Sequence, residues 1–130
     1  MSIKDKALEY HMSGYNCAQS VIAALGEYTN LDEDTALAIS AGFGGGVRSG
    51  EICGAISGAV MALGLAFPFN DANDTDAKKK ISVLASRCVA EAKEKYGCVR
   101  CLELKSNGVS CAETIGYMAE VAEKLINENK

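Results

Sequence analysis

The sequence predicts an all-α protein: a single-domain helical bundle of about five to six helices over residues 1–130, with a small-residue helix buried at its centre. Apolar residues recur at helical spacing along the whole chain, and no segment shows the alternation typical of a strand. The only proline is Pro68. At 130 residues the chain can build one core, because it buries about two thirds of the surface that its unfolded form exposes.

The first half of the chain predicts three helices. The first covers residues 2–12 and stops at a Ser-Gly pair. The second begins after Asn16, an N-cap whose side chain can bind the backbone of Gln19 while the Gln19 side chain returns the bond. The third starts near Asp32 and ends in the glycine run 42–46, which is too flexible to stay helical without outside support.

The fourth helix, expected at residues 51–67, is the most apolar segment and stops before Pro68. Gly54 and Gly58 lie four residues apart in it, a spacing that lets neighbouring backbones come close. A glycine inside a helix costs up to about 1 kcal/mol relative to alanine, so close packing is the expected compensation. We therefore expect both glycines to shape a site by bringing other helix starts within reach of Cys53.

The last part of the chain predicts two long helices joined by a short one. The fifth helix runs over residues 75–96 and ends at Gly97, the residue type that commonly follows a helix. A short helical piece is expected at 98–104. The sixth helix opens at Ser110, with Glu113 as the capping-box partner.

Composition and charge narrow the function classes. Lys and Arg number 13 against 17 Asp and Glu, a net charge of −4, and no basic stripe exists, so no nucleic-acid partner is expected. The N-terminal segment carries Asp5 and Glu9 and lacks the features of a signal peptide, so we expect a cytoplasmic protein. The charge-free stretch 52–69 is short and rich in small residues, which favours a buried helix over a membrane span. The sequence gives no indication of the oligomeric state.

Three of the six cysteines lie at predicted helix starts. Cys17 and Cys111 each follow a polar N-cap, in Asn-Cys-Ala-Gln and Ser-Cys-Ala-Glu, and Cys53 lies near the start of the fourth helix. The partial positive charge of a helix N-terminus stabilises a thiolate, and thiols there have pKa values lowered from about 8.5 to roughly 3.5–7.5. Because helical side chains lean toward the N-terminus, we expect these sulfurs to meet in one pocket.

The remaining candidates carry weaker signals. Cys98 and Cys101 form a CxxC motif after a glycine, at the start of a helical piece, which is typical of redox dithiols. Arg48, in the loop before the fourth helix, could hold a thiolate or an anion, although a solvated loop arginine is more common. Cys88 lies in the middle of an apolar helical stripe and is expected to be a buried structural thiol. His11, the only histidine, is expected at the surface or a helix end.

These residues resemble the C-GCAxxG-C-C family. The resemblance spans residues 15–125 and rests on YNCAQSV, on the element CGAISG at residues 53–58, and on CLEL and SCAETI near the C-terminus. Family members are small proteins named for four cysteines thought to act in redox chemistry. The resemblance implies that Cys17, Cys53, Cys101 and Cys111 are these cysteines. Cys98 competes with Cys101 for one place, and Cys88 and Cys98 are extra to the pattern.

Three hypotheses about function follow. In the first, the protein is a thiol–disulfide oxidoreductase that cycles these four cysteines between dithiol and disulfide with a redox partner protein, Cys53 attacking and Cys111 or Cys17 resolving. In the second, the same four thiolates hold a zinc ion or an iron–sulfur cluster. In the third, the chain is a non-catalytic helical partner of a membrane component and uses the small-residue face of its fourth helix.

Overall fold

The computed structural model describes residues 1–130 and confirms the predicted all-α class. Six helices have eight or more residues, which matches the predicted number, and two are shorter. The helices are α1 (Ile3–Met12), α2 (Cys17–Ala24), α3 (Gly26–Thr29), α4 (Glu33–Ser40), α5 (Gly54–Ala66), α6 (Thr75–Tyr96), α7 (Cys101–Ser106) and α8 (Cys111–Glu128). Two single turns, η1 (Ala41–Phe43) and η2 (Gly46–Gly50), join α4 to α5.

Most predicted helix ends are confirmed, and two predicted starts are wrong. Helix α6 has the predicted bounds, and Gly97 follows it with a φ of 78°. Helix α5 begins at Gly54 instead of residue 51, and α7 begins at Cys101 instead of residue 98. Both starts shift for the same reason: the residues just before these two helices are extended and pair with each other, through an antiparallel bridge between Ile52 and Arg100.

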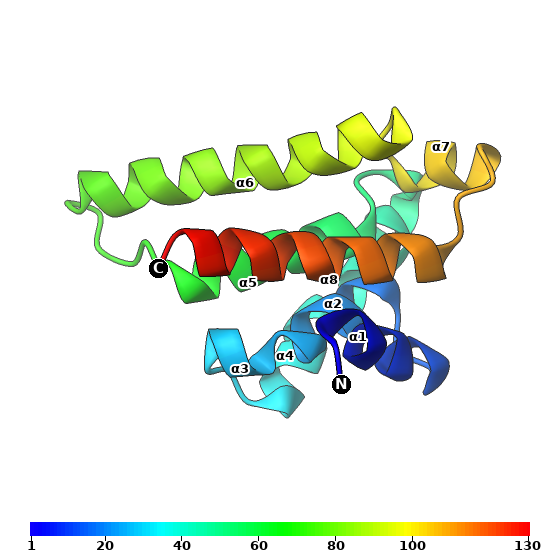
Figure 1. Ribbon diagram of the computed structural model, residues 1–130, viewed down its shortest axis with the longest axis horizontal. Coiled ribbons are helices and arrows are strands. Elements are labelled where there is room, and N and C mark those ends of the chain that lie inside the picture. Colours follow the sequence, from blue (N-terminus) through cyan, green and yellow to red (C-terminus); the bar gives the residue numbers. More distant parts are fainter.

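The helices form three layers (Figure 1). Helix α6 is the top layer, α5 and α8 lie in the middle, and α1 to α4 form the lower layer. Helix α5 contacts α2 on one side and α6 on the other, and it also packs against α8. The predicted central helix is therefore in the middle of the molecule.

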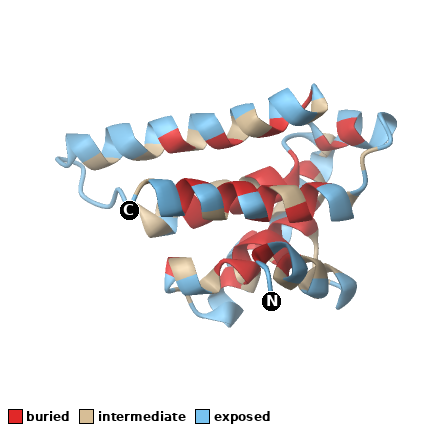
Figure 2. Ribbon diagram, in the orientation of Figure 1, coloured by how far each residue is buried: buried red, intermediate tan, exposed pale blue.

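The core runs along the facing sides of α2, α5 and α8. Ile56 and Leu63 of α5 are fully buried there, as are Ile115, Met118 and Leu125 of α8. In Figure 2 the buried residues concentrate in the middle layer and on the parts of α2 next to it, whereas the outer face of α6 is exposed. Burying one such aliphatic side chain contributes about 1.5–3 kcal/mol, so this core supplies most of the packing energy.

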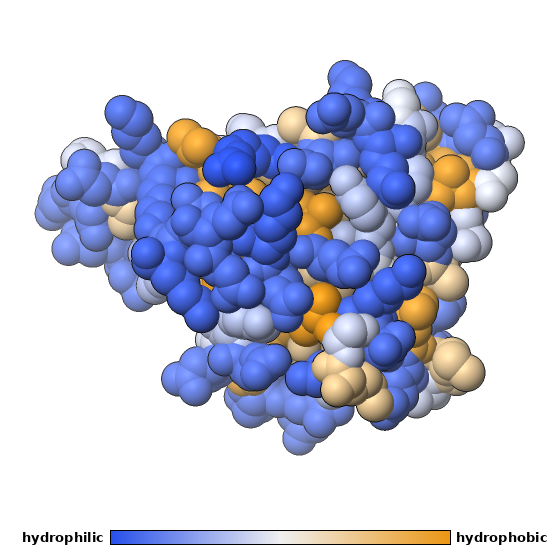
Figure 3. Space-filling view, in the orientation of Figure 1, coloured by the Kyte–Doolittle hydropathy of each residue, from blue (hydrophilic) through white to orange (hydrophobic).

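The face of the molecule in Figure 3 is mainly hydrophilic, with apolar colour confined to small separate patches. No helix combines the length and the apolar character needed to cross a bilayer. The charge-free stretch is instead the buried helix that the sequence predicts, with Ala55, Ile56, Ala59, Ala62 and Leu63 among its buried residues.

Candidate functional site: four cysteines at helix starts

Cys17, Cys53, Cys101 and Cys111, which we call the cysteine cluster, line one small cavity of about 10 Å³. The other residues that line it are Leu104, Lys105, Val109, Ser110 and Thr114. The volume is about what the centre of a single water molecule requires. The structure thus brings together, at the end of the molecule where α7 and the start of α8 lie (Figure 1), four cysteines from distant parts of the chain.

Each member of the cysteine cluster is at the start of a helix. Cys17, Cys101 and Cys111 are the first residues of α2, α7 and α8, and Cys53 is the N-cap of α5. Because side chains at a helix start lean back over the preceding loop, four converging helix starts can direct four sulfurs into one space. This is the arrangement that the sequence predicts for these thiols.

The start of α2 is fixed by the predicted capping box. The Asn16 side chain accepts a hydrogen bond from the Gln19 N–H at 2.9 Å, and the Gln19 side chain accepts one from the Asn16 N–H at 3.1 Å. The Asn16 amide also donates to the carbonyl of Ala41 in η1, at 2.9 Å. Cys17 is therefore held by its own helix cap and by the turn that follows α4.

The predicted capping box of α8 forms only in part. The Ser110 hydroxyl accepts a hydrogen bond from the Glu113 N–H at 3.1 Å, which orients Cys111 between these two residues. The Glu113 carboxylate does not return to Ser110 but accepts a bond from the Tyr96 hydroxyl, at 2.8 Å. The Glu113 carboxylate, which the sequence analysis assigned to the capping box, therefore binds Tyr96 at the end of α6. This hydrogen bond connects α6 to the start of α8.

Cys53 and Cys101 are positioned by a pairing that the sequence analysis missed. The Cys53 N–H donates to the Val99 carbonyl at 2.9 Å, and the Cys101 N–H donates to the Glu51 carbonyl at 2.7 Å. Next to these bonds, the Arg100 guanidinium contacts both carboxylate oxygens of Glu51, at 3.1 and 3.3 Å. The sequence did carry a signal for this pairing. Glu51 lies two residues before Cys53, Arg100 lies one residue before Cys101, and the two side chains have opposite charges.

Gly54 and Gly58 let α2 lie against α5, as their spacing predicts. A Cβ on Gly54 would overlap with the Cys17 Sγ and would come within 2.8 Å of the Phe43 carbonyl oxygen. A Cβ on Gly58 would come within 2.7 Å of the Ala18 carbonyl oxygen. Gly54 thus creates the space that the Cys17 sulfur occupies, directly beside Cys53.

The expectation of lowered thiol pKa values is wrong for Cys53. Burial raises the pKa of this thiol, although the backbone N–H groups of Ala55 and Ile56 at the start of α5 and the Thr114 hydroxyl act in the opposite direction. Only 5% of Cys53 is exposed. The start of α5 therefore lowers the pKa of the thiol, as the sequence predicts, but the increase caused by removing the thiol from water is larger.

Two opposing effects on the pKa also act on Cys111, which is more exposed than Cys53. Burial raises the pKa of its thiol, and the positive charge of Lys105 lowers it. Cys111 is only half-buried, whereas Cys17, Cys53 and Cys101 are 5–9% exposed. In both thiols burial therefore favours the protonated form, and the nearby groups that lower the pKa only partly offset it.

Arg48 is not brought to the cavity. It is exposed and belongs to a left-handed turn in which Gly45, Gly46, Val47 and Arg48 all have φ between 56° and 66°. Such a conformation costs about 1–2 kcal/mol for each residue with a side chain. The turn brings Gly46 onto Glu51, whose N–H donates to the Gly46 carbonyl at 3.1 Å, so it directs the chain into the paired segment before Cys53.

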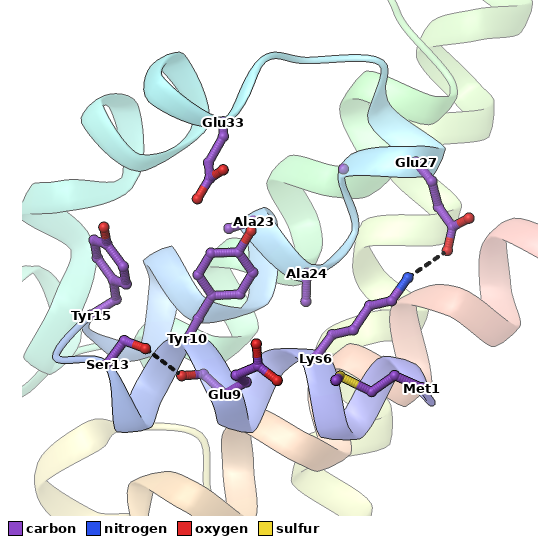
Figure 4. A pocket seen from close by; sticks show the side chains of 11 residues that line it. Met1, Lys6, Glu9, Tyr10, Ser13, Tyr15, Ala23, Ala24, Glu27 and Glu33 are labelled. Carbon is purple, nitrogen blue, oxygen red and sulfur yellow. Dashed lines mark hydrogen bonds and ion pairs between the residues drawn. The ribbon is translucent and has the colours of Figure 1, made fainter.

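A much larger hollow lies elsewhere on the surface (Figure 4). It measures about 680 Å³ and is lined by residues of α1 to α4 and their connections. The rings of Tyr10 and Tyr15 lie 5.9 Å apart in it, and Lys6 forms an ion pair of 3.3 Å with Glu27. None of the six cysteines lines this hollow.

The family profile described as "Putative redox-active protein (C_GCAxxG_C_C)" matches residues 15–125. The chain belongs to this family. Comparison with curated proteins and with solved structures found no match. The family's name writes glycine before cysteine in its central motif, whereas this chain has Cys53 before Gly54.

Cys88 and Cys98, which the sequence analysis takes as extra to the family pattern, lie outside the cavity. Cys98 comes before α7 and not at its start; its sulfur contacts the Tyr96 carbonyl oxygen at 3.8 Å and the Asn107 amide at 3.6 Å. Cys88 is fully buried in α6, as predicted, and burial raises its pKa to about 12. All six thiols are free, and no three Cys, His, Asp or Glu side chains are disposed to hold a metal ion.

Proposed function

We propose that this protein is a thiol–disulfide redox protein in which the cysteine cluster cycles between dithiol and disulfide. The observation that carries the proposal is the shared cavity: four cysteines, held by four separate helix starts, line the same small space. Membership of a family described as redox-active supports it. Chance placement of buried thiols, as for Cys88, does not require a glycine to make room for a sulfur atom beside another cysteine.

The chemistry needs an external disulfide as the oxidant. Two cluster thiols lose two protons and two electrons and form one protein disulfide, and the external disulfide takes up both and becomes two thiols. The reverse reaction reduces a partner. Burial supports this role, because thiols that are protonated and enclosed resist oxidation beyond the disulfide.

The second hypothesis assigns the same four thiols to a zinc ion or an iron–sulfur cluster. Either group would need at least three suitably placed ligands, and no three Cys, His, Asp or Glu side chains are disposed to hold a metal ion. Protein purified without oxygen, then examined by metal analysis and a visible spectrum, separates the two functions. Redox cycling predicts a colourless protein free of stoichiometric metal.

The third hypothesis, association through the small-residue face of α5, has less support. That face is covered by α2 of the same chain, whose Ala18 backbone lies against Gly58. Binding of a partner helix there would displace α2 and with it Cys17.

The proposal is tested by counting free thiols after equilibration in glutathione buffers of increasing oxidation. We expect thiols to disappear in pairs and to return on reduction, and a Cys88→Ala variant to behave like the unchanged protein. A double Cys17→Ser, Cys53→Ser variant should lose fewer thiols. Six thiols that stay free in every buffer, or equal losses in both variants, would contradict the proposal.

A further inference from the structure

The members of the cysteine cluster differ in their access to solvent. Cys17, Cys53 and Cys101 are 7%, 5% and 9% exposed, and only Cys111 is half-buried. The cavity itself holds about 10 Å³, so no molecule with a disulfide can enter it. An external disulfide can therefore reach the cluster only where Cys111 lies.

The rim of the cavity beside Cys111 carries a single positive charge. Lys105 and Ser110 line the cavity and are exposed, and Lys105 is the charged side chain that acts on the Cys111 thiol. The positive charge favours the thiolate of Cys111 and also attracts an anion that approaches it. Among the residues that line the cavity, Lys105 is the only one with a charged side chain.

Cys17 lines the same small cavity as Cys111 and lies against the start of α5, where Cys53 is the N-cap. Its sulfur occupies the place that a side chain on Gly54 would take, next to Cys53. The cavity that Cys17 shares with Cys53 and Cys111 holds only about 10 Å³, so the three thiols are close neighbours. In agreement with this closeness, a negative charge on Cys17 raises the pKa of both other thiols.

We propose that Cys111 is the outer thiol of the cluster, which alone reacts with an external disulfide carrying an anionic group, and that Cys17 transfers the oxidation from Cys111 to Cys53. This order of reaction rests on the redox function proposed above. It differs from the expectation, based on sequence, that Cys53 is the attacking thiol.

The transfer runs in three exchanges. The Cys111 thiolate attacks one sulfur of the external disulfide, which forms a mixed disulfide and releases the first thiolate. The Cys17 thiolate then attacks the Cys111 sulfur and releases the second, so a Cys17–Cys111 disulfide results. Finally the Cys53 thiolate attacks the Cys17 sulfur, and Cys111 leaves as a thiolate. In total, two protein thiols and one external disulfide give one buried disulfide and two external thiols.

The first test needs no substitution. Reduced, folded protein is treated with a limiting amount of iodoacetamide, and the labelled cysteines are identified by mass spectrometry. We expect Cys111 to be labelled at least about tenfold faster than Cys17 or Cys53, because alkylation requires an accessible thiolate. Faster labelling of Cys17 or Cys53 would overturn the order.

The second test uses an anionic disulfide, 5,5′-dithiobis(2-nitrobenzoate), and a cationic one, cystamine. Lys105→Gln should slow the anionic reagent by about fivefold and leave the cationic one unchanged or faster, since one nearby charge accounts for about that factor in water. Lys124→Gln, a charge change on the exposed part of α8, is the matched control and should change neither rate. Equal effects of Lys105→Gln on both reagents would contradict the choice of an anionic disulfide.

Single variants trap the intermediates. Cys53→Ser should stop at a Cys17–Cys111 disulfide, Cys17→Ser should stop at the mixed disulfide on Cys111, and Cys111→Ser should slow the reaction at least about tenfold. A Cys101–Cys111 disulfide in the Cys53→Ser variant would overturn the transfer through Cys17. If disulfides still form at the unchanged rate in Cys111→Ser, the outer-thiol assignment fails while the redox function stands. If no variant and no reagent gives any protein disulfide, the redox function itself fails.

Discussion

Cys88 and the cysteine cluster are two regions in which thiols are buried, and their surroundings differ. Cys88 lies in the middle of α6, fully buried, and no other cysteine affects its pKa. Cys53 is also buried, but it lies at a helix start, with the N–H groups of α5 and the Cys17 sulfur beside it. Both thiols have raised pKa values, so burial alone does not distinguish an inert cysteine from a reactive one.

The difference between the two regions is the neighbourhood of the sulfur. Around Cys53, a thiolate finds backbone donors and a second thiol that can take up the oxidation. Around Cys88, the only charge that acts on the thiol is Glu91, which opposes a thiolate. We infer that a buried cysteine becomes useful for redox chemistry when several helix starts meet at it.

The largest expected effect on stability concerns Gly54, which lies against Cys17 in the cysteine cluster. Gly54→Ala should destabilise the protein by about 1–3 kcal/mol, because the new methyl group overlaps with the Cys17 sulfur in a packed interior. Gly64→Ala, in the same helix but with open space at the Cβ position, is the matched control and should stabilise by about 0.5–1 kcal/mol. Urea unfolding measures both. Equal effects of the two substitutions would mean that the close approach of Cys17 to α5 is not what Gly54 permits.

The next effect is a loss of stability at alkaline pH, to which the burial of Cys88 contributes. The pKa of Cys88 is about 12 in the folded protein, against about 8.5 for an unfolded thiol. Above pH 8.5 the unfolded chain loses this proton while the folded one keeps it, so stability should fall by up to about 1.4 kcal/mol per pH unit from this group. Cys53 and Cys111 act in the same direction.

A Cys88→Ala variant checks this assignment. Its unfolding free energy, measured from pH 7 to 9.5, should fall less steeply than that of the unchanged protein, even if the smaller side chain lowers stability at pH 7. An identical slope in both proteins would show that burial of Cys88 does not control the alkaline loss.

A smaller effect is expected at the cap that holds Cys17. Asn16→Ala removes the hydrogen bond to the Gln19 N–H and should cost about 1–2 kcal/mol. Ser2→Ala, which removes the corresponding bond from α1 far from the cluster, should cost about 1 kcal/mol or less. The sharper readout is the rate of protein disulfide formation, which Asn16→Ala should slow and Ser2→Ala should not. Equal rates would indicate that the cap supports the helix without positioning the thiol.

The smallest effect on stability is expected at the Glu51–Arg100 pair. Both side chains are largely exposed, so Arg100→Gln should cost less than about 1 kcal/mol, similar to Arg87→Gln at another exposed pair. Only Arg100→Gln should change how Cys53 and Cys101 react, because it lies in the segment that aligns them. Thermal unfolding and alkylation rates of the two variants, compared side by side, test this difference; matching alkylation rates would contradict it.

The fold could be predicted from local signals. Asn16 with Gln19, Gly97 after a long amphipathic run, and Ser110 before Cys111 mark helix ends that depend only on nearby residues. The starts of α5 and α7 could not be predicted in the same way, because Glu51–Cys53 is extended only through its bonds to Val99–Cys101, almost fifty residues away.

The convergence of Cys17, Cys53 and Cys111 could be predicted from helix starts and from glycine spacing. Cys101 was assigned to the same site only through the family resemblance. The directions of the pKa shifts could not be predicted in this way, because they depend on how deeply each thiol is buried. The sequence does not show the depth of burial. Helix-start effects on Cys53 are present but smaller than the effect of burial. Arg48 was misleading for a related reason: its loop turns left-handed and directs the side chain into solvent instead of the cavity.

The most direct test of the account is the position of the disulfides that form when the folded protein is partly oxidised. After treatment with less than one equivalent of diamide, quenching in acid and digestion, mass spectrometry identifies the linked cysteines. We predict that the linked pairs come only from Cys17, Cys53, Cys101 and Cys111, and that Cys88 stays a free thiol. Disulfides that join Cys88 or Cys98 to the others as often as they form within the cluster would contradict the central claim, which is that four helix starts create one shared thiol site.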